Sequence, residues 1–200
     1  MIHTNTPQTL GAKAAAALDH DLMTACGYSI DQLMELAGLS VSQAGELPTV
    51  FYPKRSKADL FSRLATQLET LRVPFVDDFE PAMASTDQVV DAIFGFSFSG
   101  EVREPFPAVI RALEQSKLPI MSVDAPSSWD IEKGPPASGL GSRFMPSALV
   151  SLTAPKPLVK HFRGRHFIGG RFVPPSIASR YELDLPQYKG IDQVVEVSKI

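Results

Sequence analysis

The sequence predicts an α/β protein whose mostly parallel sheet is covered by helices on both faces. Short apolar segments rich in β-branched and aromatic residues alternate with amphipathic helical segments along most of the chain. A length of 200 residues, with 44% hydrophobic and 20% charged residues, is typical of one ordinary globular domain. Polar residues also follow several of the apolar segments, and the carboxyl ends of strands are where such sheets bind ligands.

The first 45 residues are expected to be helical. Residues 9–24 (TLGAKAAAALDHDLMT) are rich in alanine and leucine, which favour helices. Ser29 followed by Gln32 is a capping-box signature for a second helix. Apolar residues then recur at helical spacing, and a glycine can close the helix: Ile30, Leu33, Met34, Ala37, Val41 and Gly45. We assign residues 1–45 to N-terminal helices and 46–200 to an α/β core within one domain.

The remaining elements follow from changes of period. Residues 57–72 (KADLFSRLATQLETLR) place leucines and a phenylalanine on one helical face: Leu60, Phe61, Leu64, Leu68 and Leu71. Residues 105–116 form a short helix with prolines confined to its first turn, where they are tolerated. The predicted strands are residues 48–53, 88–96, 118–126, 147–155 and 166–174.

Charge and cysteine content exclude several classes of protein. A net charge of -3 gives no reason to expect binding to nucleic acid or a membrane surface. No apolar run reaches the roughly 20 residues of a transmembrane helix. The single cysteine, Cys26, excludes an internal disulfide and is expected to be a small buried side chain.

Two carboxylates are the most informative candidates for a site. Asp91 lies inside the apolar run VVDAIFGF, and Asp124 ends the run LPIMSVD. A carboxylate in an apolar strand is costly unless it is paired or bound to a cation. The simpler alternative is that each caps a helix or pairs with a nearby lysine. Other polar residues at strand ends are Lys54, Arg55, Ser127, Asp130, Thr153 and Lys156.

Five segments together resemble the NAD(P)H-hydrate epimerase family, also called the YjeF N-terminal domain. They are GYSIDQLMELAGLSVSQA, FYPKR, VVDAIFGFSFSGEVREPF, SVDAPSSWDIEKG and SLTAPKPLVKHFRGRHFIGGRFVP. The segments cover nearly the whole chain and occur in the same order as in the family. Their sequences are most similar to those of the fungal branch. The resemblance implies a Rossmann-like three-layer αβα sandwich. It also implies interconversion of the R and S forms of hydrated NADH and NADPH in cofactor repair.

The resemblance further implies a site and partners. It places Lys54 and Asp124 in the substrate pocket, and Asp91 and Ser127 as ligands of one potassium ion per subunit. Because epimerisation at C6 needs an acid and a base, we assign Asp124 and Lys54 as the catalytic acid/base pair, and their individual roles stay open. The substrate would be bound by Asp124 and by the loop Gly95, Phe96, Ser97, Phe98, Ser99, Gly100 and Glu101. A homodimer is expected, without nucleic acid or membrane partners. The cytoplasm is the expected location, with mitochondria as the alternative.

One part of the family pattern is missing from this chain. The family has a strand, a glycine-rich loop similar to GPGNNGGDG and a helix before the YPKR strand, whereas here Gln43 leads almost directly to Pro48. The unit takes roughly 30 residues and would supply phosphate-binding N–H groups and a potassium ligand. Ser128 also stands where the family's PSGWD has glycine. The expected sheet therefore lacks one strand–loop–helix unit, which should expose edges and core.

The gap leaves two functional interpretations open. In the first, the chain is an epimerase whose activity is impaired by the missing loop. In the second, it is non-catalytic, either as a dimerisation and interaction scaffold of the same fold or as an inactive splice form. A skipped exon, a real deletion and a mistaken translation all fit the gap. A Rossmann dehydrogenase is disfavoured because no GxGxxG motif occurs.

Overall fold

The structure is a computed structural model that describes residues 9–30, 32–34, 38 and 48–197. Its main sheet has five strands in the order β3-β4-β5-β6-β7. These strands are β3 (Val89–Asp91), β4 (Ile120–Val123), β5 (Ala148–Leu152), β6 (Arg165–Gly169) and β7 (Val194–Val197). The first four run parallel, and β7 pairs with β6 in the antiparallel sense. The predicted mostly parallel sheet is therefore confirmed.

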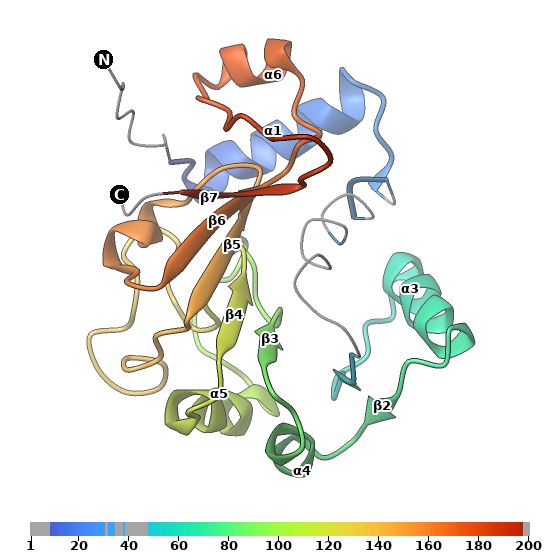
Figure 1. Cartoon of the computed structure of the whole chain (residues 1–200), viewed down its shortest axis with the longest axis vertical. Coiled ribbons are helices and arrows are strands. Elements are labelled where there is room, and N and C mark those ends of the chain that lie inside the picture. Colours follow the sequence, from blue (N-terminus) through green and yellow to red (C-terminus); the bar gives the residue numbers. More distant parts are fainter. Residues whose placement is uncertain (1–8, 31, 35–37, 39–47, 198–200) are drawn as a thin grey trace.

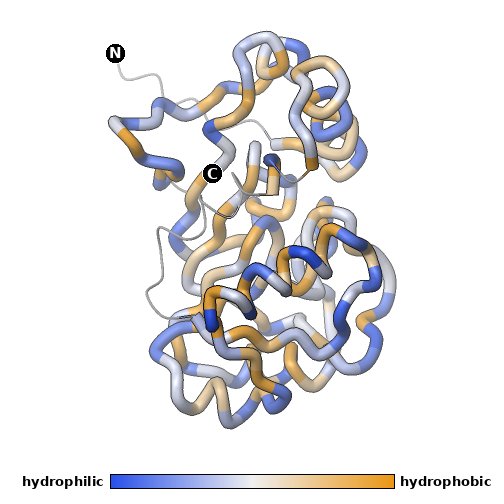
Figure 2. Tube along the Cα trace, turned by 90° about the vertical axis from the view of Figure 1, so that its right-hand side faces the viewer, coloured by the Kyte–Doolittle hydropathy of each residue, from blue (hydrophilic) through white to orange (hydrophobic). Residues whose placement is uncertain are grey.

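Helices lie on both sides of this sheet. On one side, α1 (Ala12–Thr24) and α6 (Pro175–Arg180) share an apolar cluster centred on Leu18, Leu22 and Ile177. On the other side, α5 (Phe106–Gln115) packs Val109 and Leu113 against Ile120 of β4. In Figure 2, polar and apolar residues alternate along the helices, as expected for helices that bury one face. A three-layer αβα arrangement results.

A second, smaller sheet precedes the main one. Strands β1 (Val50–Phe51) and β2 (Phe75–Val76) pair in parallel and flank α3 (Asp59–Thr70), and α4 (Phe79–Ala84) follows. Among the described residues, no ladder joins either of these strands to β3, and Figure 1 shows β1, β2 and α3 set apart from the main sheet. The division into two sheets agrees with the exposed strand edges expected from the missing strand–loop–helix unit.

Most predicted elements match the structure in type and position. The strand and helix predictions from residue 48 onward coincide with β1, α3, β3, α5, β4, β5 and β6, while β2, α4, α6, β7 and the 3₁₀ helix η1 (Pro157–His161) were not predicted. The capping box is confirmed, since the Ser29 N–H donates to Gln32 Oε1 at 2.8 Å and the Gln32 N–H donates to Ser29 Oγ at 3.2 Å. Ala37, Val41, Gly45 and the boundary at 45/46 lie outside the described residues.

No helix in the described part of the chain is long and apolar enough to cross a membrane.

Candidate active site

Three charged side chains lie at the carboxyl ends of neighbouring strands, and two of them, Asp124 and Lys156, contact each other. Asp91 is the last residue of β3, Asp124 directly follows β4, and Lys156 lies four residues after β5. Because β3, β4 and β5 are adjacent and parallel, their carboxyl ends lie at one edge of the sheet. The edge predicted from the sequence therefore carries Asp91, Asp124 and Lys156, but not Lys54.

Asp91 is enclosed by hydroxyl and backbone donors. Its side chain is almost fully buried, at 2% exposure. Oδ2 accepts hydrogen bonds from Ser122 Oγ at 2.7 Å and from the Ser127 N–H at 2.9 Å, and Oδ1 accepts one from Ser127 Oγ at 2.5 Å. Burial raises the pKa of Asp91, while the hydrogen bonds from Ser127 and Ser122 act in the opposite direction. Asp91 and Ser127, the two expected potassium ligands, are hydrogen-bonded to each other, and binding of the ion stays a prediction.

Asp124 is held in an unusual backbone conformation. Its φ is +68°, a left-handed region that non-glycine residues rarely adopt and that often marks functional sites. Oδ2 accepts a hydrogen bond from the Phe96 N–H at 2.7 Å, and Oδ1 accepts one from Lys156 Nζ. A Cβ atom at Gly95 would lie 3.3 Å from Oδ2, so the absence of a side chain there lets the loop approach the carboxylate.

Lys156 is the buried cation of this site. It is 3% exposed, and its Nζ donates to the Leu152 carbonyl at 2.7 Å as well as to Asp124. The ring of Phe96 lies 5.9 Å from Nζ, within cation–π range. Asp19 of α1 is also near: burial raises the pKa of Asp19, the Lys156 ammonium lowers it, and the Asp124 carboxylate raises it. A buried lysine between carboxylates is suited to hold or move a proton.

The predicted substrate loop touches the site with its first residues. Gly95 and Phe96 contact Asp124, as described above. The loop continues through a turn in which the Phe98 N–H donates to the Gly95 carbonyl at 3.0 Å, and the Phe98 ring stacks on Phe94 at 4.4 Å. The remaining residues are exposed to solvent: Ser97, Ser99, Gly100 and Glu101. The loop thus has a half-buried end at Asp124 and an exposed end that a ligand can reach.

Lys54, the predicted partner of Asp124, is found elsewhere. It is exposed and follows β1, which belongs to the smaller sheet. The structure pairs Asp124 with Lys156 instead, so a catalytic role for Lys54 stays a prediction. The sequence signal for Lys156 was its position after a strand, which it shared with Lys54. No comparable signal pointed to Asp19, because it lies on a helix rather than at a strand end.

Ser128 is strained and poorly satisfied. Its φ is +80°, and its buried Oγ has no hydrogen-bond partner among the described residues. A Cβ atom at Gly141 would lie 1.7 Å from that oxygen, so the hydroxyl occupies the space beside a glycine. The backbone conformation is the one a glycine would adopt without cost, in agreement with the glycine expected at this position.

Comparisons with known proteins agree with this geometry. The family model described as YjeF-related protein N-terminus matches residues 42–158. A protein of Fusarium vanettenii named NAD(P)H-hydrate epimerase is 66% identical, over 95% of this chain and 96% of its own length. A protein of the same name from Neurospora crassa is 58% identical over 96% of each chain. The crystal structure of yeast ynu0 (YNL200c) superposes with a TM-score of 0.86 at 33% identity, covering 95% of this chain and 100% of its own.

The relatives also carry residues that this chain lacks. The alignment to the Fusarium protein runs over 226 positions, more than the 200 residues of this chain. The relative therefore has at least one segment with no counterpart here, as expected from the gap near residue 45. Three findings lead to one conclusion: the sequence identity to these relatives over nearly the full chain, the matching family model and the similar solved structure. The chain belongs to the YjeF-related protein N-terminus family.

Proposed function

We infer that this chain is an isomerase, an NAD(P)H-hydrate epimerase that interconverts the R and S forms of hydrated NADH and NADPH. The observation that carries this inference is the buried Asp124–Lys156 pair beside the Gly95–Phe96 end of the loop, in a chain that is 66% identical to a protein named for this activity. The substrate is a small molecule, and both nicotinamide cofactors are within the proposed class.

The chemistry requires one acid and one base. Inversion at C6 can proceed when the ring nitrogen lone pair expels the hydroxyl group as water, which leaves an iminium ion. Water then adds to either face and loses a proton. In the ion pair, the Lys156 ammonium is the group that can donate a proton to the leaving hydroxyl, and the Asp124 carboxylate is the group that can accept one from the incoming water. Proton transfer by positioned side chains typically contributes about 10²–10⁴-fold.

The surroundings of the pair preserve these roles. The Phe96 N–H and the Lys156 ammonium each hold one oxygen of Asp124, so the carboxylate cannot rotate freely. The Leu152 carbonyl anchors the lysine from the other side at 2.7 Å. Since both residues are buried, their interaction acts in a medium of lower dielectric than water, which strengthens it.

We propose that one potassium ion per subunit is held beside Asp91 and Ser127. The Asp91 carboxylate and the hydroxyl groups of Ser122 and Ser127 are the oxygen atoms here that a hard cation could use as ligands. A bound cation would supply positive charge that keeps Asp91 ionised despite its burial.

The proposal is tested by supplying one pure epimer of hydrated NADPH in potassium buffer. Formation of the other epimer is followed by chromatography against the uncatalysed rate, with wild type compared with Asp124→Asn and with the exposed control Asp87→Asn. Activity that Asp124→Asn abolishes and Asp87→Asn retains supports the proposal. A folded wild type, by circular dichroism, that epimerises at the background rate refutes it and favours the scaffold. For potassium, the thermal midpoint should rise in potassium relative to choline buffer, and Asp91→Asn should remove that rise.

A further inference from the structure

A pocket lies at the end of the main sheet opposite to the candidate active site. It occupies about 370 Å³ and is lined by Pro135, Ser142, Arg143, Phe144, Met145, Lys160, His161 and Arg163. Met145 shortly precedes β5, and Arg163 shortly precedes β6. The pocket, here called the basic pocket, is thus at the amino ends of these strands, whereas Asp91, Asp124 and Lys156 are at the carboxyl ends. It is separate from the candidate active site.

The charge of the basic pocket is one-sided. Arg143, Lys160 and Arg163 line it together with His161, and no acidic residue does. Within the described part of the chain, none of these three cations forms an ion pair. By contrast, Arg165, two residues after Arg163 in the chain, donates hydrogen bonds to both carboxylate oxygens of Glu196, at 2.8 and 2.9 Å. The three exposed cations of the pocket create a local positive potential that can attract an anion, in a protein whose net charge is -3.

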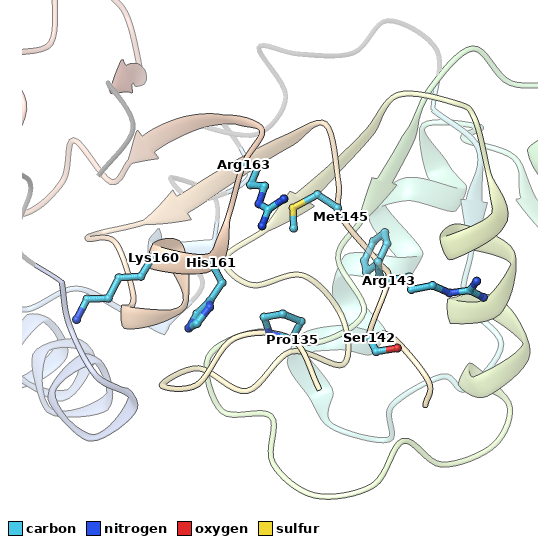
Figure 3. Close-up of a pocket in the computed structure, with 8 residues that line it drawn as sticks. Pro135, Ser142, Arg143, Met145, Lys160, His161 and Arg163 are labelled. Carbon is cyan, nitrogen blue, oxygen red and sulfur yellow. The ribbon is translucent and has the colours of Figure 1, made fainter. Parts of the chain in front are cut away.

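The arrangement of side chains gives the pocket donors on more than one side. Figure 3 shows Arg163 extending toward Met145 and His161 extending toward Pro135, while Lys160 and Arg143 extend outward on either side. The ring of His161 packs against Gly134, where a Cβ atom would come within 2.5 Å of Cδ2. Because Gly134 has no side chain, the ring can occupy this place beside the pocket. Arg163 and His161 are therefore the close donors, and Lys160 and Arg143 add positive potential.

We propose that the basic pocket binds a phosphate group, supplied as free phosphate or as a phosphomonoester. Arginine presents a planar fork of N–H donors that matches phosphate oxygens, and a histidine ring N–H adds a further donor. A water molecule occupies about 30 Å³ in the liquid, so the cavity has room for a phosphate group with part of its hydration. Pro135 and Met145 give the pocket an apolar border against which the organic part of an ester can pack.

Titration calorimetry with the full chain in chloride buffer tests this site, using inorganic phosphate, AMP and adenosine as separate probes. Arg163→Gln should weaken binding of both anions about tenfold, the loss expected for one charge-assisted hydrogen bond. Lys160→Gln should weaken it less and should make binding less sensitive to added salt. Lys133→Gln is the matched control, because Lys133 is exposed in the neighbouring loop but does not line the pocket. It should bind as wild type does.

The outcomes separate the sources of the phosphate group. Equal affinity for inorganic phosphate and AMP identifies free phosphate as a sufficient ligand, and tighter binding of AMP identifies a phosphomonoester. The proposal is overturned when neither anion binds saturably, when adenosine binds as well as AMP, or when Lys133→Gln weakens binding as much as Arg163→Gln. Circular dichroism of each variant confirms that the exposed substitutions leave the fold intact.

Discussion

Two regions of this chain have similar kinds of sequence but very different burial. From Val89 to Val197, the strands carry fully buried side chains such as Leu149 and Ile168, and the helices bury Ile110 and Ile177. From Val50 to Ala84, the two strands and two helices contribute one side chain, Ala65, to the buried core. The predicted helix α3 does form, but its apolar face is not fully buried: Phe61 is 43% exposed and Leu71, just after the helix, is 73% exposed.

The difference shows that an amphipathic pattern creates a need for a partner without supplying one. Helix α3 and strand β1 have the apolar residues of a buried layer, but β1 pairs only with β2 among the described strands. On the other side of the division, β3 presents Val90 at 46% exposure in the middle of an edge strand. The strand–loop–helix unit absent from the sequence is the kind of element that would cover both surfaces.

The largest expected effect is on catalysis, and it distinguishes a catalytic lysine in the well-packed region, residues 89–197, from one in the weakly packed region, residues 50–84. Lys156→Met should reduce epimerisation by about 10²–10⁴-fold, because it removes the proton donor beside Asp124. Lys54→Met should leave the rate within about twofold, as is usual for an exposed side chain away from the chemistry. Initial rates and circular dichroism are measured for both. A loss of activity in folded Lys54→Met would show that the site draws on both regions.

Amide hydrogen exchange should divide the chain at the same place. Residues 50–76 should exchange about 10³-fold faster than residues 148–169, because local opening free energies run from near zero up to the full stability of about 5–15 kcal/mol. Mass spectrometry of peptides after timed exchange provides the measurement. Equal protection of the two segments would mean that they unfold as one unit, and would contradict the difference in stability between the two regions.

The well-packed region should also respond to acid through His166. This side chain is 4% exposed and is hydrogen-bonded to Ser151 Oγ at 2.9 Å through Nε2. Burial and the nearby Lys156 ammonium lower the pKa of His166 to about 4. Because the unfolded chain takes up this proton near pH 6.5 and the folded chain near pH 4, stability is fully present above pH 6.5 and falls as pH is lowered toward 4.

The loss from His166 should reach about 3 kcal/mol at the acid end of this range. Urea unfolding at a series of pH values measures it, and His166→Gln should flatten the dependence over the same range while keeping a partner for Ser151. An unchanged pH dependence in a folded His166→Gln would assign the acid sensitivity to another group.

The smallest effect concerns strain inside the well-packed region. Ser128→Gly should raise the free energy of unfolding by about 1 kcal/mol, because it relieves the positive φ and removes a buried hydroxyl without a partner. Urea unfolding compares it with Ser138→Gly, an exposed loop position with no comparable strain. Destabilisation by Ser128→Gly would show that the hydroxyl has a stabilising contact.

The sequence predicted this fold well where local pattern and tertiary packing agree. Residues 118–126 were predicted as a strand and contain β4, and residues 105–116 were predicted as a helix and contain α5. It missed β7, a short segment of valines and a glutamate whose pairing with β6 depends on residues far away in the chain. It also missed α6, which begins at Pro175 behind another proline.

The site was predictable in its two carboxylates but not in its lysine. Asp91 and Asp124 were identifiable because a carboxylate in an apolar run needs a partner wherever the run is buried. The choice between Lys54 and Lys156 depends on which strands share a sheet. It also depends on the turn after β5, where Thr153 has a φ of +69° and Lys156 folds back on Leu152. Neither feature leaves a mark in residue spacing.

The open edge of β3 has a consequence for the life of this chain in a cell. Among the described residues the outer edge of β3 is unpaired and carries an exposed valine, and such an edge is a template for pairing with other chains and a surface that chaperones and proteases recognise. Faster removal by quality control should therefore lower the steady-state amount of this protein at a given rate of synthesis. Proteolytic turnover would then limit, together with the rate constant of the site, how much cofactor repair the chain contributes.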